Sequence, residues 1–186
     1  MVRASHGASA TADALESAQS LWGQAHRVKA ATVDLNAVLK AYQALQGREI
    51  WKHDGTFIEK YQPTFGPGVK ERFAFAKTVH DKDLTEQESL CEQAVRHING
   101  LLADSSVLIL PTLPGAGLKL NCSPDDMNAF RSKMSASFCL GGLAGVPWIT
   151  LPLTEIDGAP LGVSLVSACG TDAWLLELSK ALVQNR

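Results

Sequence analysis

The sequence predicts an α/β fold, in which one β-sheet of parallel or mixed strands is flanked by helices. The first observation is the apolar run Val107–Leu110, which a proline stops, as expected of a strand buried on both faces. The second is a pair of strand-like segments, 148–153 and 161–167, with Asp157-Gly158 between them as a turn. The third is the helical spacing of apolar residues in the segments around these strands.

Three elements are predicted before residue 47. Apolar residues recur every three to four positions from Ala12 to Ala25, which predicts a helix with one apolar face. Val28–Leu35 is richer in β-branched residues and predicts a strand. Helical spacing returns from Asn36 to Gln46. The segment 47–68 is mixed in character and ends in a loop that contains two prolines and two glycines.

Three helix starts are marked by capping residues. Thr85 and Glu88 have the spacing of a capping box, which predicts that a helix begins there. The segment Ser123–Asp126 combines a hydroxyl cap, a proline and two acidic residues, so it predicts the start of a helix that ends near Gly141. Thr171-Asp172 predicts the start of a last helix.

The composition predicts a single globular domain, residues 1–186. Apolar residues make up 46% of the chain and charged residues 19%, a balance typical of globular proteins. The formal charge of -2 gives no electrostatic attraction to nucleic acid or to an anionic membrane. No apolar run approaches the ~20 residues that span a bilayer. We therefore expect neither nucleic acid nor a membrane as a partner.

The cysteines predict a reducing compartment. Cys91, Cys122, Cys139 and Cys169 form no C-x-x-C pair, and their spacing fits no zinc or haem site. Free, mostly buried thiols are typical of proteins in a reducing environment. The segment 1–15 lacks the apolar core of a secretory signal. We therefore expect a cytoplasmic location.

Two His-Asp pairs raise the possibility of a metal site. His53-Asp54 and His80-Asp81 would suit a metal phosphohydrolase only if further ligands came from separate helices. We interpret both pairs as solvated turn residues, because the remaining histidines offer few additional ligands. The sequence therefore predicts no metal ligand and no cofactor.

Nucleophilic catalysis also lacks its usual residues. No G-x-S-x-G or S-x-x-K motif is present in the chain. Lys133 and Ser137 are four residues apart on a predicted helix, but a pair fixed on a helix has no backbone donors for an oxyanion. Cys139 lies in apolar surroundings that keep a thiol inert, so we interpret it as a packing residue. We assign no catalytic residue to this sequence.

Four stretches carry a resemblance to a known family. They are FGPGVKERFAFA (65–76), VLILPTLPG (107–115), FCLGGLAGVPWITLPL (138–153) and APLGVSLVSACGTDAWLLELSKAL (159–182). In this order, and at these separations, they resemble the C-terminal half of the amidase signature family, serine amidohydrolases that cleave C–N bonds. The resemblance runs from about Leu15 to the end of the chain, and it implies a partial amidase-signature fold with a mixed β-sheet flanked by helices.

The resemblance also implies where the chemistry lies. The family uses a nucleophilic serine, a second serine held by a cis peptide, a lysine base and an oxyanion hole in a Gly/Ser-rich loop. All of these belong to the N-terminal half, and no residue here matches them. The strand end at 111–114 and the helix at 137–142 resemble elements that line the acyl side of the substrate pocket. Thr112, Phe138 and Cys139 are the pocket-wall residues that this implies.

Three function hypotheses follow. The first is the C-terminal portion of an amidase-type hydrolase acting on C–N bonds of small amides, which is inactive alone and meets its substrate only when the missing half completes it. The alternative is a non-catalytic binding or scaffold protein derived from an amidase, whose unpaired strand edge meets a complementary chain or a second copy in a homo-oligomer. A metal phosphohydrolase that uses the His-Asp pairs is the third, and the small number of ligands disfavours it.

Overall fold

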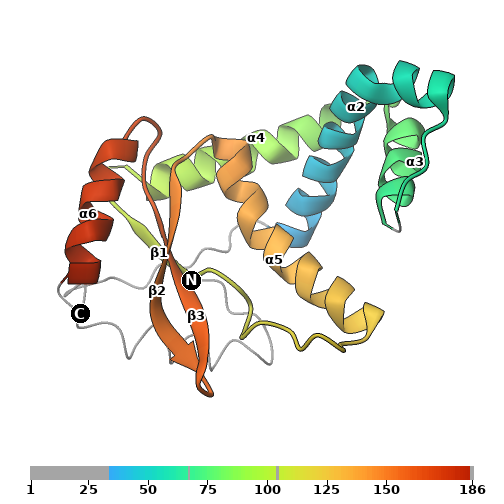
Figure 1. Cartoon of the computed structure of the whole chain (residues 1–186). Coiled ribbons are helices and arrows are strands. Elements are labelled where there is room, and N and C mark those ends of the chain that lie inside the picture. Colours follow the sequence, from blue (N-terminus) through green and yellow to red (C-terminus); the bar gives the residue numbers. More distant parts are fainter. Residues whose placement is uncertain (1–33, 67, 104, 185–186) are drawn as a thin grey trace. The chain divides into compact units, whose positions relative to one another are not determined.

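The computed structural model of the chain describes residues 34–66, 68–103 and 105–184 (Figure 1). These residues belong to two compact units, one formed by Leu35–Ala94 and the other containing the chain from Val95 onward. The predicted helix at 12–25, and all but the end of the predicted strand at 28–35, lie outside the described residues. That the chain forms one domain stays a prediction.

The unit Leu35–Ala94 is helical. It contains α2 (Leu35–Tyr61), α3 (Val69–Val79) and the first part of α4 (Thr85–Leu101). The predicted helix at 36–46 is confirmed. α2 continues beyond it to Tyr61, through most of the segment 47–68 whose sequence is mixed in character. The pair His53-Asp54 therefore lies on an exposed part of a helix and not in a turn.

Helices α2 and α3 pack closely because Gly47 has no side chain. A Cβ at this position would lie 2.9 Å from Val79 Cγ2 and 3.4 Å from Ala76 Cα. An exposed ion pair also joins the two helices, since Lys77 Nζ lies 2.7 Å from Glu59 Oε1. The hydrogen bond and positive charge of Lys77 lower the pKa of Glu59. Both side chains of this ion pair are exposed to solvent, so the packing at Gly47 contributes more to the stability of the helix contact than the ion pair does.

Helix α4 begins where predicted, but the residue that caps it differs. The Asp83 carboxylate accepts hydrogen bonds from the Thr85 backbone N–H at 3.0 Å and from the Thr85 hydroxyl at 2.7 Å. These bonds lower the pKa of Asp83. Glu88 does not complete a capping box, because its carboxylate pairs with Arg48 of α2. The capping-box prediction is therefore wrong about the mechanism and right about the boundary.

The second unit is built on a three-stranded sheet in the order β1-β3-β2. The strands are β1 (Leu108–Pro111), β2 (Trp148–Ile156) and β3 (Ala159–Val166). β3 pairs antiparallel with both neighbours, so no parallel pair is present among the described strands. The predicted turn between β2 and β3 is confirmed. Asp157 and Gly158 both have positive φ, at 52° and 73°, as a tight hairpin turn requires.

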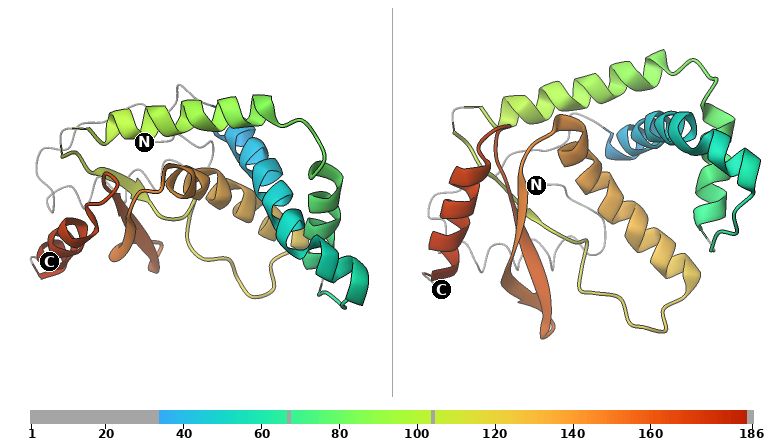
Figure 2. Two further views of the ribbon diagram at one scale, coloured as in Figure 1. Left: turned by 90° about the horizontal axis from the view of Figure 1, so that it is seen from above. Right: turned by 45° about the horizontal axis from the view of Figure 1, so that its top comes forward.

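One face of this sheet packs against α6 (Asp172–Gln184). Leu175 and Leu182 of this helix share a buried cluster with side chains of β2 and β3. The strand residues of the cluster are Leu151, Leu153, Val163 and Leu165. The last helix therefore covers the side of the sheet to which the odd-numbered residues of β3 point (Figure 2).

The other face packs against α5 (Pro124–Ala144) and the end of α4. Val166 is buried there with Ile98 and Leu102, and Leu140 of α5 packs against the same cluster. Both views in Figure 2 place α5 and α6 on opposite sides of the sheet. An α/β arrangement with helices on both faces is thus confirmed for this part of the chain.

The ends of α5 follow the predicted chemistry. The Ser123 hydroxyl accepts a hydrogen bond from the Asp126 backbone N–H at 3.0 Å, and a proline occupies the first turn. The helix continues past the predicted end to Ala144, where Gly145 adopts a left-handed conformation with φ 62°. No helix within the described ranges has the length and apolar character required to cross a membrane.

A close contact between α5 and β2 generates a testable prediction. A Cβ at Gly141 would lie 2.7 Å from Trp148 Cε3, so Gly141→Ala forces the indole or the helix to move. We expect the free energy of unfolding, measured with urea, to fall by about 1–3 kcal/mol.

Gly100→Ala is the matched control, because a Cβ at this helical glycine meets nothing within 4 Å. This change should stabilise the protein by up to about 1 kcal/mol through helix propensity. Equal effects of the two substitutions would contradict the packing of Gly141 against Trp148.

Candidate functional site

Three hydroxyl groups meet on the α5 side of the sheet, one from each strand region. Thr112 Oγ1 lies 2.7 Å from Ser164 Oγ, and Thr150 Oγ1 lies 3.3 Å from the same atom. Thr112 Oγ1 is also 3.4 Å from Thr150 Oγ1. Ser164 is fully buried, whereas Thr150 is exposed. We call Thr112, Thr150 and Ser164 the hydroxyl cluster.

The sheet register explains why the hydroxyl cluster forms. Ser164 of β3 is paired with Leu110 on one side and with Thr150 on the other. Thr112 follows β1 and continues the hydrogen bonding of that strand to β3, because its backbone N–H donates to the Gly162 carbonyl at 2.9 Å. A Cβ at Gly162 would lie 2.6 Å from Thr150 Cγ2 and 2.8 Å from Thr112 Oγ1. Because Gly162 has no side chain, the side chains of both threonines have room to approach Ser164.

Phe138 lies on the same side of the sheet as the hydroxyl cluster. Its ring is tilted against the Trp148 ring, with 4.9 Å between the ring centroids. Trp148 and Thr150 are alternate residues of β2, so their side chains point to the same face. The structure thus brings Thr112 and Phe138 to the same side of the sheet.

Cys139 is a core residue of α5. It is buried, and its Sγ lies 3.4 Å from the Ala136 carbonyl one turn earlier in the helix. The interpretation of this thiol as a packing residue is confirmed. None of the four cysteines, all of which lie in the described part of the chain, forms a disulfide.

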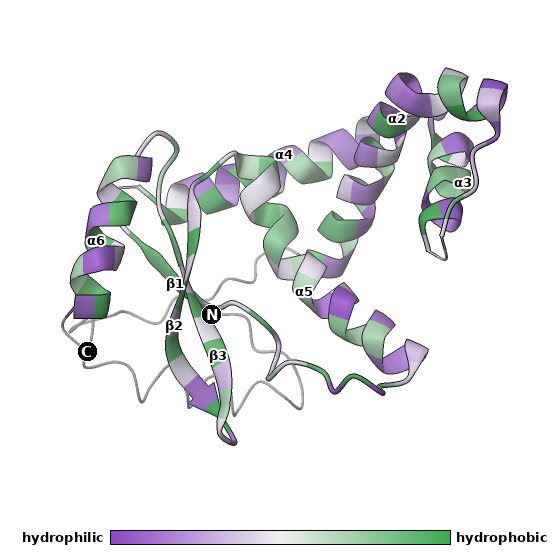
Figure 3. Ribbon diagram, in the orientation of Figure 1, coloured by the Kyte–Doolittle hydropathy of each residue, from purple (hydrophilic) through white to green (hydrophobic). Residues whose placement is uncertain are grey.

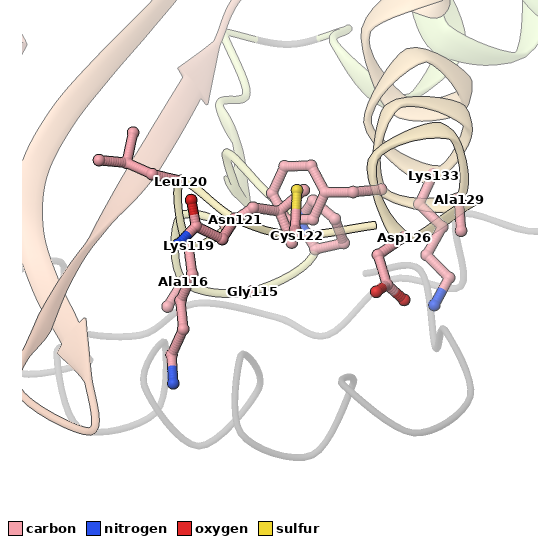
Figure 4. Close-up of a pocket in the computed structure, with 12 residues that line it drawn as sticks. Gly115, Ala116, Lys119, Leu120, Asn121, Cys122, Asp126, Ala129 and Lys133 are labelled. Atoms are coloured by element: carbon pink, nitrogen blue, oxygen red, sulfur yellow. The ribbon is translucent and has the colours of Figure 1, made fainter. Parts of the chain in front are cut away.

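A hollow of about 810 Å³ lies between the loop 114–122 and the first half of α5 (Figure 4). Its lining is mostly apolar and includes Phe130 and Leu118, with charged groups contributed by Lys119, Asp126 and Lys133. Thr112, Phe138 and Cys139 do not line this hollow. Their role as pocket-wall residues stays a prediction.

Neither His-Asp pair contributes to a metal site within the described ranges. His80 Nδ1 lies 2.8 Å from the carboxylate of the adjacent Asp81, a local pair in which His80 is half-buried and Asp81 is exposed. His53 lies on α2, and no group of three or more His, Cys, Asp or Glu side chains among the described residues could hold a metal ion.

Sequence reasoning found Thr112 and missed its two partners. Thr150 and Ser164 belong to no motif, and only the pairing of β3 with both neighbours brings them to Thr112. The signal available in the sequence was the hairpin turn, which sets β2 opposite β3.

Comparison with known proteins identifies the chain. "Amidase 1" of Arabidopsis thaliana is 30% identical over 148 residues, which cover 80% of this chain and 35% of that protein. A solved structure described as a bacterial aryl acylamidase of the amidase signature family superposes with a TM-score of 0.71 at 16% identity, covering 92% of this chain and 39% of that one. The chain belongs to the amidase signature family.

The same region recurs in other amidase-type proteins. A crystal structure of an amidase matches with a TM-score of 0.76 at 21% identity, over 95% of this chain and 41% of that one. No protein-family model matches. The chain spans about a third of the length of the "Amidase 1" relatives, and it corresponds to their C-terminal part.

Two further relatives carry other names. "Outer envelope protein 64, chloroplastic" of Arabidopsis thaliana is 26% identical, over 73% of this chain and 23% of that protein. A subunit of the glutamyl-tRNA(Gln) amidotransferase of Paenarthrobacter aurescens is 30% identical, over 63% of this chain and 24% of that protein. By its name, the second of these is one component of a larger assembly.

The thiols provide a test of the local structure. Burial raises the pKa of the Cys91 thiol, and Cys139 is buried as well, whereas Cys169 is exposed. Because the thiolate is the reactive form, iodoacetamide at pH 8 should label Cys169 well before Cys91 or Cys139. Peptide mass spectrometry measures the order, and protein unfolded in urea, in which all four thiols should react, is the control. Early labelling of Cys139 would contradict its place in the core.

Proposed function

We propose that this chain supplies the C-terminal portion of an amidase-type hydrolase that cleaves C–N bonds of small amides. The observation that carries the proposal is the match to about a third of "Amidase 1", together with the fold shared with amidase structures. The Gly/Ser-rich nucleophile segment that the resemblance leads one to expect is not among these 186 residues. In the proposal, amidase polypeptide outside these residues supplies the nucleophile and its base.

The chemistry of the hydroxyl cluster supports this division of roles. A serine or threonine attacks an amide only when an adjacent base accepts its proton and donors stabilise the oxyanion. The hydrogen bonds of Thr112, Thr150 and Ser164 through their side chains join these hydroxyls to one another, and none joins them to a described lysine, histidine or carboxylate. These hydroxyls therefore have no activating partner within the described residues, which supports an inactive chain in isolation.

The proposal gives the three pocket-wall residues a supporting role. Thr112 and Phe138 share one face of the sheet, so both can border a substrate that approaches from that side. Cys139, the next residue of α5 after Phe138, is buried, and in the proposal its packing fixes the position of this part of the helix. The substrate in the proposal is a small amide, and its acyl side faces these residues.

The proposed setting is a single amidase domain that is completed in the cytoplasm. The absence of a disulfide among the four described cysteines supports a reducing compartment. The proposed partner is a complementary amidase polypeptide, and the existence of a relative that is itself one component of an amidotransferase supports an assembly.

A non-catalytic scaffold is the second candidate. The observation that favours it is the likeness to a chloroplast envelope protein whose name describes a location and not an amidase. As a scaffold, the fold would bind a partner chain without hydrolysing an amide.

Reconstitution of activity tests the first candidate against the second. The purified chain alone should release no ammonia from a small amide such as acetamide. Together with the amidase segment encoded upstream or by a neighbouring gene, it should raise the rate by at least about 10³-fold over background, because the nucleophile and the oxyanion donors are then present.

The control is the same mixture with the nucleophilic serine of the added segment replaced by alanine, which should return the rate to background. Hydrolysis by the chain alone would overturn the proposal. A stable assembly that contains the complete amidase segment and does not hydrolyse amides would favour the scaffold.

A further inference from the structure

The hollow between the loop 114–122 and α5 has the size and lining of a small-molecule site. Its volume of about 810 Å³ lies in the range of pockets that hold organic ligands. Leu118 and Phe130 contribute to its mostly apolar lining, and Leu120, which also lines it, is fully exposed. Figure 3 shows hydrophobic and hydrophilic residues next to one another along this loop and along the first turns of α5. An apolar ligand in the hollow would remove these apolar side chains from water.

Two lysines give the hollow a positive charge. Figure 4 shows Lys119 on the loop and Lys133 on α5, with the hollow between them. Neither lysine forms an ion pair with an acidic residue in the part of the chain that the structure describes. Both ammonium groups therefore remain available to a negatively charged ligand.

Asp126 does not compensate both positive charges. It is the one acidic residue in the described lining of the hollow. Its carboxylate accepts a hydrogen bond from the Ser123 hydroxyl at 2.7 Å. It also lies in the first turn of α5, where the helix dipole stabilises a negative charge. The carboxylate of Asp126 thus stabilises the start of the helix, and the described lining keeps an excess of positive charge.

We propose that this hollow binds a small carboxylate with an apolar body, such as an arylalkanoic acid. The charges of Lys119 and Lys133 attract the carboxylate, and the apolar body covers Leu118, Leu120 and Phe130. An inorganic anion would satisfy the charges but would leave the apolar lining in water. An acid of this class is also what hydrolysis of an apolar amide releases, but the inference does not depend on the proposed function.

Nuclear magnetic resonance titration of the purified, isotopically labelled chain tests the inference with three probes. 4-Phenylbutyrate should bind with a Kd on the order of 1 mM, with the largest shift changes at the backbone amides of residues 114–133. The neutral 4-phenylbutanol and the apolar-poor acetate should each bind at least about threefold more weakly, since each lacks one half of the recognition. No binding of 4-phenylbutyrate, equal affinity for the alcohol or for acetate, or shift changes confined to other residues would overturn the inference.

A carboxylate added to the wall of the hollow gives an independent readout. Ala129 lines the hollow and is exposed, so Ala129→Glu places a negative charge beside the ligand without a change in the core. This variant should weaken binding of 4-phenylbutyrate by at least about threefold. Asn128→Glu adds the same charge at an exposed neighbouring position that does not line the hollow, so it is the matched control. Equal effects of the two variants would contradict binding in the hollow.

Removal of a lysine should affect the charged probe alone. Lys119→Gln and Lys133→Gln should each weaken binding of 4-phenylbutyrate by at least about twofold and leave binding of 4-phenylbutanol unchanged. Arg131→Gln removes a positive charge from α5 outside the hollow, and it should change neither affinity. An equal effect of Arg131→Gln, or no effect of either lysine variant, would overturn the role of the two lysines. Because these experiments measure binding to the chain alone, their failure would leave the proposed function intact.

Discussion

The burial of strand β3 is the constraint on which the rest of the second unit depends. Leu161, Val163, Leu165 and Val166 are at most 2% exposed, and Ser164 between them is fully buried. Each such apolar side chain contributes about 1.5–3 kcal/mol when it leaves water. This strand can be buried only if β1 and β2 pair along both of its edges and helices cover both of its faces. α6 covers one face, while α5 and the end of α4 cover the other.

The hydroxyl cluster is a consequence of the same strand. A buried serine hydroxyl needs hydrogen-bond partners, because an unpaired polar group costs free energy in a dry environment. Thr112 and Thr150 provide these partners from the two neighbouring strands, and Gly162 leaves the space for them. Ser164 of β3 thereby links all three strand regions, on the side of the sheet against which Phe138 of α5 packs. The candidate site and the core of the sheet are parts of one arrangement.

The sequence was sufficient for elements whose local chemistry is strong. Asp157-Gly158 specifies a hairpin turn, and the helix that begins after Ser123 carries its own cap and first-turn proline. The relative directions of β1 and β3 were not predictable in the same way. The apolar run at 107–110 fits a buried strand in either direction, and only tertiary pairing with β3 makes it antiparallel.

The register of the hairpin shows why the site was only partly predictable. Counting back from the turn would place Leu151 opposite Ser164, but an irregularity between Leu151 and Thr154 shifts the pairing and brings Thr150 there instead. Pro152 lies within this irregularity, where a strand tolerates a residue without an N–H. A proline within a strand suggests such a bulge, but its position and size depend on packing. Thr112 was found through the family resemblance, whereas Thr150 and Ser164 required the three-dimensional register.

The central claim is that this chain functions as one part of a larger amidase fold. The mass of the native protein in its source, measured by native mass spectrometry of the gently purified material, tests this claim most directly. We expect a particle heavier than the 19.9 kDa of these 186 residues, in which the additional mass is amidase-type polypeptide, whether in the same chain or in a bound one. A particle of 19.9 kDa, with no amidase sequence attached to it, would show that the chain does not function as part of a larger amidase fold.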